Sequence, residues 1–269
     1  MTRLLDAQDV LNAMEEATIA LFAANHGHGG CELIRAPGQV STWAPCPSPA
    51  LNAILQTRAP ASDFEQLIHH AKQRSKGRAF LWKVMPNDHH REVLISRLLS
   101  DGFIELEPST PIWGVIPPEL DELRVHLPAA TPVRSAEDFA QWLIPFRAAF
   151  DLCAEDAALC QSAAVTSDLS AEAPIQHVLI EVDGRPVASG TLVLTHPTLA
   201  AVFNVAVLPE ARREGHGTSI LAALAATAMD QHRTHLGQLS TAAGLPLYAN
   251  WGQRSRQTCR NFLYLQEAA

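Results

Sequence analysis

A short turn with two arginines and two glycines lies between a strand pattern and a helix pattern. The apolar stretch Phe203–Leu208 leads into the turn, and apolar residues recur at helical spacing from Ile220 to Met229. The first N–H groups of a helix lack partners within it, and the helix dipole adds positive charge there, so this turn suits a phosphate. Glycines at two of its positions let the backbone approach a bulky anion closely. The turn consists of Arg212, Arg213, Glu214, Gly215, His216, Gly217 and Thr218.

The spacing of the turn excludes two common phosphate-binding motifs. A P-loop needs Gly-x-x-x-x-Gly followed by lysine, and no lysine occurs in this turn. A dinucleotide fold needs Gly-x-Gly-x-x-Gly after its first strand, whereas here the glycine order differs and the strand comes late in the chain. A nucleotide-binding protein of another class remains as an alternative.

The pattern Arg-x-x-Gly-x-Gly resembles the acyl-CoA pyrophosphate loop of the GNAT acyltransferase superfamily. The resemblance extends upstream to three consecutive strand patterns, at Gln176–Val182, Val187–Leu194 and Leu199–Val207. Downstream, the residues from Leu247 to Gly252 are similar to the family's Leu-Tyr-x-x-x-Gly-Phe segment. The resemblance covers roughly residues 130–269.

The resemblance implies that acetyl-CoA is the co-substrate and that the turn binds its pyrophosphate. It also implies that the backbone of one strand binds the pantetheine arm, because the family's strand separates from its neighbour there. The strand residues concerned are Val205, Ala206 and Val207. Family members often carry a glycine and then a basic residue where this chain has Arg213 and Glu214. A carboxylate beside a pyrophosphate is unfavourable unless it points to solvent.

Tyr248 stands where the family places a general acid that protonates the departing CoA thiolate. A phenol, with an ordinary pKa near ~10, suits that role. The alternative is an aromatic side chain that only packs. Two neighbours differ from the family pattern, since Thr241 replaces an asparagine and Gln253 replaces a phenylalanine after the glycine.

No general base is evident in the sequence. Some members of the family use a glutamate on the strand before the loop, but this chain has Asn204 there, and an amide does not accept a proton at neutral pH. His177 and Glu181 on an earlier strand are candidates, as is a water relay.

The composition of the chain excludes several classes of protein and partner. Apolar residues make up 47% of the 269 residues and charged residues 18%, as in a well-cored globular protein. The net charge of −8 argues against a nucleic-acid partner and favours neutral or cationic substrates. No signal peptide or membrane-spanning run is evident, so we expect a cytoplasmic protein without a membrane partner. The five cysteines and the pair His26 and His28 lack metal-ligand spacing, so we expect free thiols and no metal.

The first half of the chain closes with the order strand, helix, Gly102-Phe103, strand, which is similar to the closing elements of a GNAT domain. We therefore expect an α+β fold of tandem GNAT-like domains, each a mixed, mainly antiparallel sheet flanked by helices. The expected division is a degenerate domain at 1–128 and an acetyl-CoA-binding domain at 129–269. The expected function is transfer of an acetyl group from acetyl-CoA to a primary amine of a small molecule. A non-catalytic acyl-CoA-binding regulatory module is the alternative, and the sequence does not indicate the acceptor or the oligomeric state.

Overall fold

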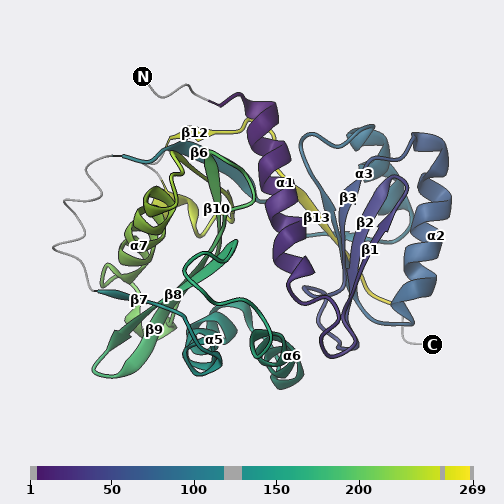
Figure 1. Cartoon of the computed structure of the whole chain (residues 1–269). Coiled ribbons are helices and arrows are strands. Elements are labelled where there is room, and N and C mark those ends of the chain that lie inside the picture. The colour runs from purple at the N-terminus through teal and green to yellow at the C-terminus, as the bar shows by residue number, and fades with distance from the viewer. Residues whose placement is uncertain (1–4, 118–128, 249–251, 267–269) are drawn as a thin grey trace.

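The computed structural model describes residues 5–117, 129–248 and 252–266, and its strands form two sheets (Figure 1). In the N-terminal sheet only the β3–β4 pair is parallel. The order of the described strands in this sheet is β1 (Glu32–Ala36), β2 (Gln39–Trp43), β3 (Ala53–Thr57), β4 (Phe80–Val84), β13 (Arg260–Tyr264) and β5 (Ile104–Glu105).

The C-terminal sheet is likewise mainly antiparallel, and its one parallel pair among the described strands is β10–β11. Its order is β12 (Gln253–Arg254), β6 (Thr110–Val115), β11 (His235–Ser240), β10 (Leu199–Val207), β9 (Arg185–Val193), β8 (Ile175–Val182) and β7 (Ala130–Pro132). The predicted α+β class with two mixed, mainly antiparallel sheets is confirmed.

Helices cover both faces of each sheet. Helices α2 (Phe64–Ser75) and α3 (Arg91–Ser100) bury their apolar sides on one face of the N-terminal sheet. Helix α7 (His216–Asp230) covers one face of the C-terminal sheet, while α5 (Ala136–Phe150) and α6 (Ala154–Ala164) lie on the other. Among the described residues, no helix has the length and apolar character that crossing a bilayer requires.

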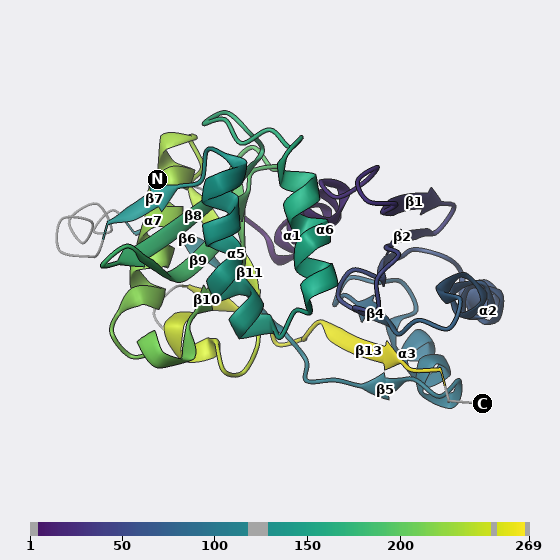
Figure 2. The same ribbon diagram turned by 90° about the horizontal axis from the view of Figure 1, so that it is seen from below.

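Helix α1 (Ala7–Ala23) joins the two sheets by packing on both. Its first turns bury Val10 and Met14 against strands of the C-terminal sheet, and its last turns bury Ile19 against the N-terminal sheet. Figures 1 and 2 both show α1 between the two sheets. At its N-terminus the Asp6 carboxylate accepts a hydrogen bond from the Asp9 N–H at 2.8 Å and caps the helix.

The two sheets exchange strands. Strand β6 precedes residue 128 but pairs with β11 in the C-terminal sheet, and β13 follows residue 129 but lies between β4 and β5 in the N-terminal sheet. Each sheet therefore needs strands from both sides of the expected boundary between residues 128 and 129.

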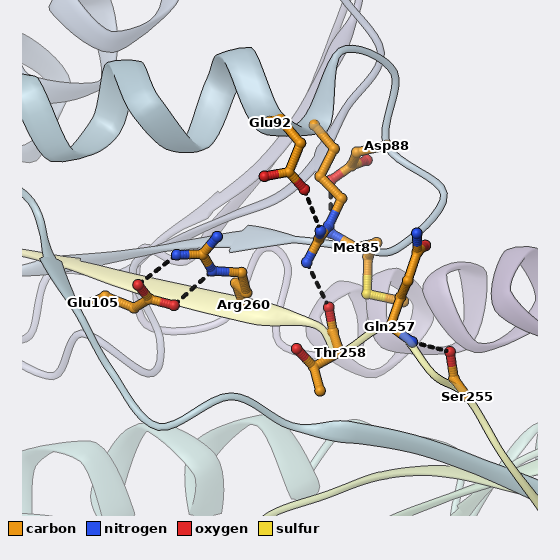
Figure 3. Close-up of polar contacts among 9 residues, drawn as sticks. Met85, Asp88, Glu92, Glu105, Ser255, Gln257, Thr258 and Arg260 are labelled. Carbon is orange, nitrogen blue, oxygen red and sulfur yellow. Dashed lines mark hydrogen bonds and ion pairs between the residues drawn. The ribbon is translucent and has the colours of Figure 1, made fainter.

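Strand β13 is held in the N-terminal sheet by apolar and charged contacts. The Phe262 side chain is fully buried in the core beneath α2 and α3. The Arg260 guanidinium donates two hydrogen bonds to the Glu105 carboxylate of β5, as Figure 3 shows. Just before the strand, Arg91 donates to the Thr258 carbonyl at 2.9 Å. The exchanged strand is thus an integral part of the N-terminal core.

Two buried carboxyl groups meet where α1 packs on the N-terminal sheet. Glu15 of α1 forms an ion pair with Arg58, and Asp88, in the loop after β4, accepts a hydrogen bond from the Met85 N–H at 2.7 Å. Burial raises the pKa of Asp88 to about 7, and the nearby Glu15 carboxylate adds to the effect. The folded protein therefore holds a proton on Asp88 that the unfolded chain releases.

Asp88 should make the protein less stable as the pH rises. The pKa of Asp88 is higher in the folded protein than its ordinary value of 3.8. The contribution of Asp88 to the free energy of unfolding is therefore fully present below pH 3.8 and is lost as the pH rises through about 7. Asp88→Asn cannot ionise and keeps an oxygen for the Met85 N–H, so its unfolding free energy should fall less over this range. Urea unfolding of both proteins at several pH values measures the difference. Parallel pH profiles would show that Asp88 is not the titrating group.

Candidate functional site

Strands β10 and β11 separate part-way along their length. Within the described chain they pair only between Leu199–Ala201 and His235–Gly237. Beyond that point β10 continues to Val207 alongside β9, while β11 continues to Ser240 alongside β6. The second half of β10 therefore faces a gap in the sheet.

A bulge at Asn204 changes the direction of β10 at this gap. Phe203 pairs with Thr191 and Ala206 pairs with Ser189, so two residues of β10 lie opposite one residue of β9. Asn204 has a φ of 53°, in the left-handed region that asparagine tolerates better than most residues. Before the bulge, the even-numbered Val202 points to the face of the sheet that α7 covers. After the bulge, Val205 and Val207 point to that face and pack against the core beneath α7.

The predicted phosphate-binding turn lies at the end of β10 and leads directly into α7. Gly215 has a φ of 88° and occupies the N-cap position, and no side chain caps the helix there. A Cβ built on Gly215 would meet no other atom within 4 Å, so open space lies in front of the helix N-terminus. The first N–H groups of α7 therefore remain available to an anion.

Side chains around the turn leave that space open. Arg212 and Arg213 are exposed, and the Arg212 Nε donates to the Val207 carbonyl at 3.4 Å. The Glu214 carboxylate lies 3.3 Å from the Nε2 of His216, which is buried at the start of α7. Glu214 thus has a partner within the turn itself. The remaining predicted turn residues are Gly217, which is half-buried, and Thr218, which is exposed.

Tyr248 lies at the gap between β10 and β11. It closes the short helix η3 (Leu245–Tyr248) and is buried, with 7% of its surface exposed. Burial raises the pKa of its hydroxyl well above the ordinary value, so it is protonated at neutral pH. A small cavity opens beside it and is lined by Ile112, Trp113, Val202, Leu236, Gly237, Gln238 and Tyr248.

Neither side chain that the sequence offered as a general base lies at the gap. His177 is on β8, two strands from β10, where its Nδ1 is 2.9 Å from the Thr191 hydroxyl and its ring packs edge-on against Trp142. Burial lowers its pKa to about 4, so it is neutral and a weak base at pH 7. Glu181 is exposed at the far end of the same strand.

The N-terminal sheet has no equivalent site among its described residues. In its parallel pair, strand β3 leads into α2 through the segment Arg58-Ala59-Pro60-Ala61-Ser62-Asp63, which contains no glycine, and β4 follows α2. Pro60 has no N–H group, and the acidic Asp63 stands at the start of α2. The Trp82 Nε1 donates to the Thr57 hydroxyl at 3.0 Å, so an indole spans the space beside β3.

The two histidines His26 and His28 each have a hydrogen-bonding neighbour. The His26 Nδ1 accepts a hydrogen bond from the Leu33 N–H at 3.0 Å, and His28 lies beside the Thr166 hydroxyl. In the part of the chain that the structure describes, no group of three metal-ligating side chains has a suitable arrangement.

Comparisons with known proteins find a family match in the C-terminal half of the chain. Residues 136–252 match the acetyltransferase (GNAT) family. No curated protein sequence matches the chain.

Solved structures show that the fold of the whole chain is that of tandem GNAT proteins. A GCN5-related N-acetyltransferase from Kribbella flavida has a TM-score of 0.65 at 15% identity, with 96% of each chain covered. A conserved Staphylococcus epidermidis protein of unknown function has a TM-score of 0.63 at 16% identity, covering 89% of this chain and 96% of its own. A tandem GNAT protein from the clavulanic acid biosynthesis pathway has a TM-score of 0.56 at 12% identity, and the match covers 98% of this chain and 97% of that protein.

Proposed function

We propose that the protein transfers an acetyl group from acetyl-CoA to a primary amine of a small molecule, using a site carried by residues 129–269. The observation that carries this proposal is the uncapped N-terminus of α7, with open space before Gly215, next to the half of β10 that pairs with β9 but not with β11. One end of this surface offers N–H groups to a pyrophosphate, and the other offers free backbone groups to an amide-rich arm.

The chain's own groups account for each part of the reaction. The α7 turn binds the pyrophosphate, and the backbone of Val205–Val207 aligns the pantetheine arm in the gap. The amine attacks the thioester carbon, the carbon–sulfur bond breaks, and the electron pair remains on sulfur. The Tyr248 hydroxyl gives its proton to that thiolate, while the new amide nitrogen loses a proton to water. Solvent returns a proton to the phenolate.

A non-catalytic acyl-CoA-binding regulatory module is the second candidate, and it is favoured because neither His177 nor Glu181, the candidate bases, lies at the gap. Both candidates require acetyl-CoA binding, but only the enzyme releases CoA. A thiol-release assay across a panel of primary amines, run beside calorimetry of acetyl-CoA binding, separates them. Binding without release by any amine would favour the regulatory module.

Gly215→Asp should lower acetyl-CoA affinity by about tenfold or more. The new carboxylate would occupy the open space where we place the pyrophosphate, and two like charges at ~4 Å repel by about 1–4 kcal/mol at effective dielectric constants of ~80 to ~20. Calorimetry measures the affinity.

Gly184→Asp is the matched control for this substitution. Gly184 lies in the turn between β8 and β9, with a φ of 73° and no atom within 4 Å of a built Cβ. The control thus adds the same charge and similar backbone strain away from α7. Equal affinities for the two variants would contradict the location of the pyrophosphate.

A further inference from the structure

Gln238 is a buried polar residue whose amide nitrogen has no partner. It lies on β11 with 8% of its surface exposed, and its Nε2 makes no hydrogen bond within the described residues. Buried amide groups are normally hydrogen-bonded, and an unsatisfied donor costs free energy, so an orphaned one calls for an explanation. Sequence analysis did not single out this residue, since a glutamine on a strand is no motif.

The position of Gln238 connects it with Tyr248. Its cross-strand partner on β6 is Ile112, and both residues line the cavity at the gap together with Tyr248. Val202 of β10 lines the same cavity. The orphaned amide is therefore located where we place the departing sulfur and the Tyr248 hydroxyl.

The contact between Gln238 and Tyr248 has a defined electrostatic effect. Burial raises the pKa of Tyr248, which makes the phenol a weaker proton donor. The Gln238 side chain acts in the opposite direction and lowers that pKa, because an amide donor stabilises a phenolate oxygen.

We propose that Gln238 is a positioning residue for Tyr248, whose Nε2 donates a hydrogen bond to the phenolate oxygen that forms when Tyr248 gives its proton to the CoA thiolate. This inference rests on the proposed function. In the resting protein the donor has no other partner, so no existing bond must break when the phenolate forms. The negative charge passes from sulfur to the phenolate oxygen and is then neutralised by a proton from solvent.

Thr241, which stands where the family has an asparagine, is engaged elsewhere. Its Oγ1 accepts a hydrogen bond from the Gly244 N–H at 3.3 Å, and its carbonyl accepts one from the Ser240 hydroxyl at 3.0 Å. These bonds build the turn that leads into η3. Among the residues that line the cavity, Gln238 is thus the one whose side-chain amide acts on the Tyr248 hydroxyl.

Gln238→Met tests the proposal, because methionine keeps the length and volume of glutamine but lacks the amide. Its kcat should fall by about 10–100-fold, the expected effect of losing a hydrogen bond to a charged group, with little change in the KM for acetyl-CoA. Gln238→Glu places a carboxylate beside the phenolate as it forms, so its kcat should fall by at least as much as that of Gln238→Met. In a Tyr248→Phe background, Gln238→Met should cause no further loss.

Gln176→Met is the matched control, since Gln176 is a buried glutamine on β8, two strands away from β10, and the kcat of this variant should stay within about twofold of the wild type. Thermal unfolding and acetyl-CoA calorimetry on every variant show that the fold and the binding site remain. Equal losses in the wild-type and Tyr248→Phe backgrounds, or a full-rate Gln238→Met, would overturn the inference while leaving the proposed function in place. Absence of turnover by the wild type across the amine panel would overturn both.

Discussion

Tyr248→Phe is expected to lower kcat by about 10²–10⁴-fold, with little change in the KM for acetyl-CoA. The substitution removes one hydroxyl and almost no volume, from a side chain buried at the gap between β10 and β11. Without the phenol, the thiolate has to leave unprotonated or take its proton from water. Steady-state kinetics with an amine that the wild type accepts measures the effect.

Acyl donors of different leaving ability sharpen this test. A thiol that is a better leaving group needs less protonation, so the loss caused by Tyr248→Phe should shrink with such a donor. Tyr264→Phe is the control, because Tyr264 is the other tyrosine of the chain and packs against Phe80 and Phe103 in the N-terminal sheet. A full-rate Tyr248→Phe enzyme would rule out the acid role and favour protonation of the thiolate by solvent.

Phe262→Ala is expected to lower the free energy of unfolding by about 3–5 kcal/mol, the usual range for a buried phenylalanine truncated to alanine. Phe262 is fully buried at the centre of the N-terminal core, although it is encoded far from the other strands of that sheet. Urea denaturation monitored by tryptophan fluorescence measures the change, since Trp43 and Trp82 lie in the same core.

Leu265→Ala is the matched control, because Leu265 follows the same strand but is 49% exposed. Its unfolding free energy should stay within about 0.5 kcal/mol of the wild type. If Phe262→Ala were as stable as this control, β13 would not be a structural part of the N-terminal sheet.

Local features of the fold followed from the sequence. The apolar helical pattern of Ala7–Ala24 predicts the first helix to within one residue of α1, because apolar periodicity is a local signal. The pattern of Asp88–Ser100 likewise predicts a helix, but α3 begins three residues later, at Arg91. The Asp88 carboxylate instead accepts the Met85 N–H, and His90 has a left-handed φ of 54°.

Features that depend on distant segments did not follow from the sequence. The stretch Arg260–Tyr264 consists of two polar residues followed by three apolar or aromatic ones, and nothing in it indicates that it inserts between β4 and β5. For the candidate site, the turn to which we assign phosphate binding could be proposed from the sequence because its residues are seven consecutive ones. The role proposed for Gln238 could not, because it depends on two strands meeting η3 in space.

The strand exchange also determines the order in which the protein can assemble during synthesis. Domains usually fold as units, with the N-terminal one first as the chain emerges from the ribosome. Here β13 is translated after every other described strand, so the N-terminal sheet cannot be completed before the chain of the C-terminal sheet has been made. Until then, Trp82 of β4 and the core beside it lack the neighbour that covers them. The half of the protein that is made first is therefore the half that finishes folding last.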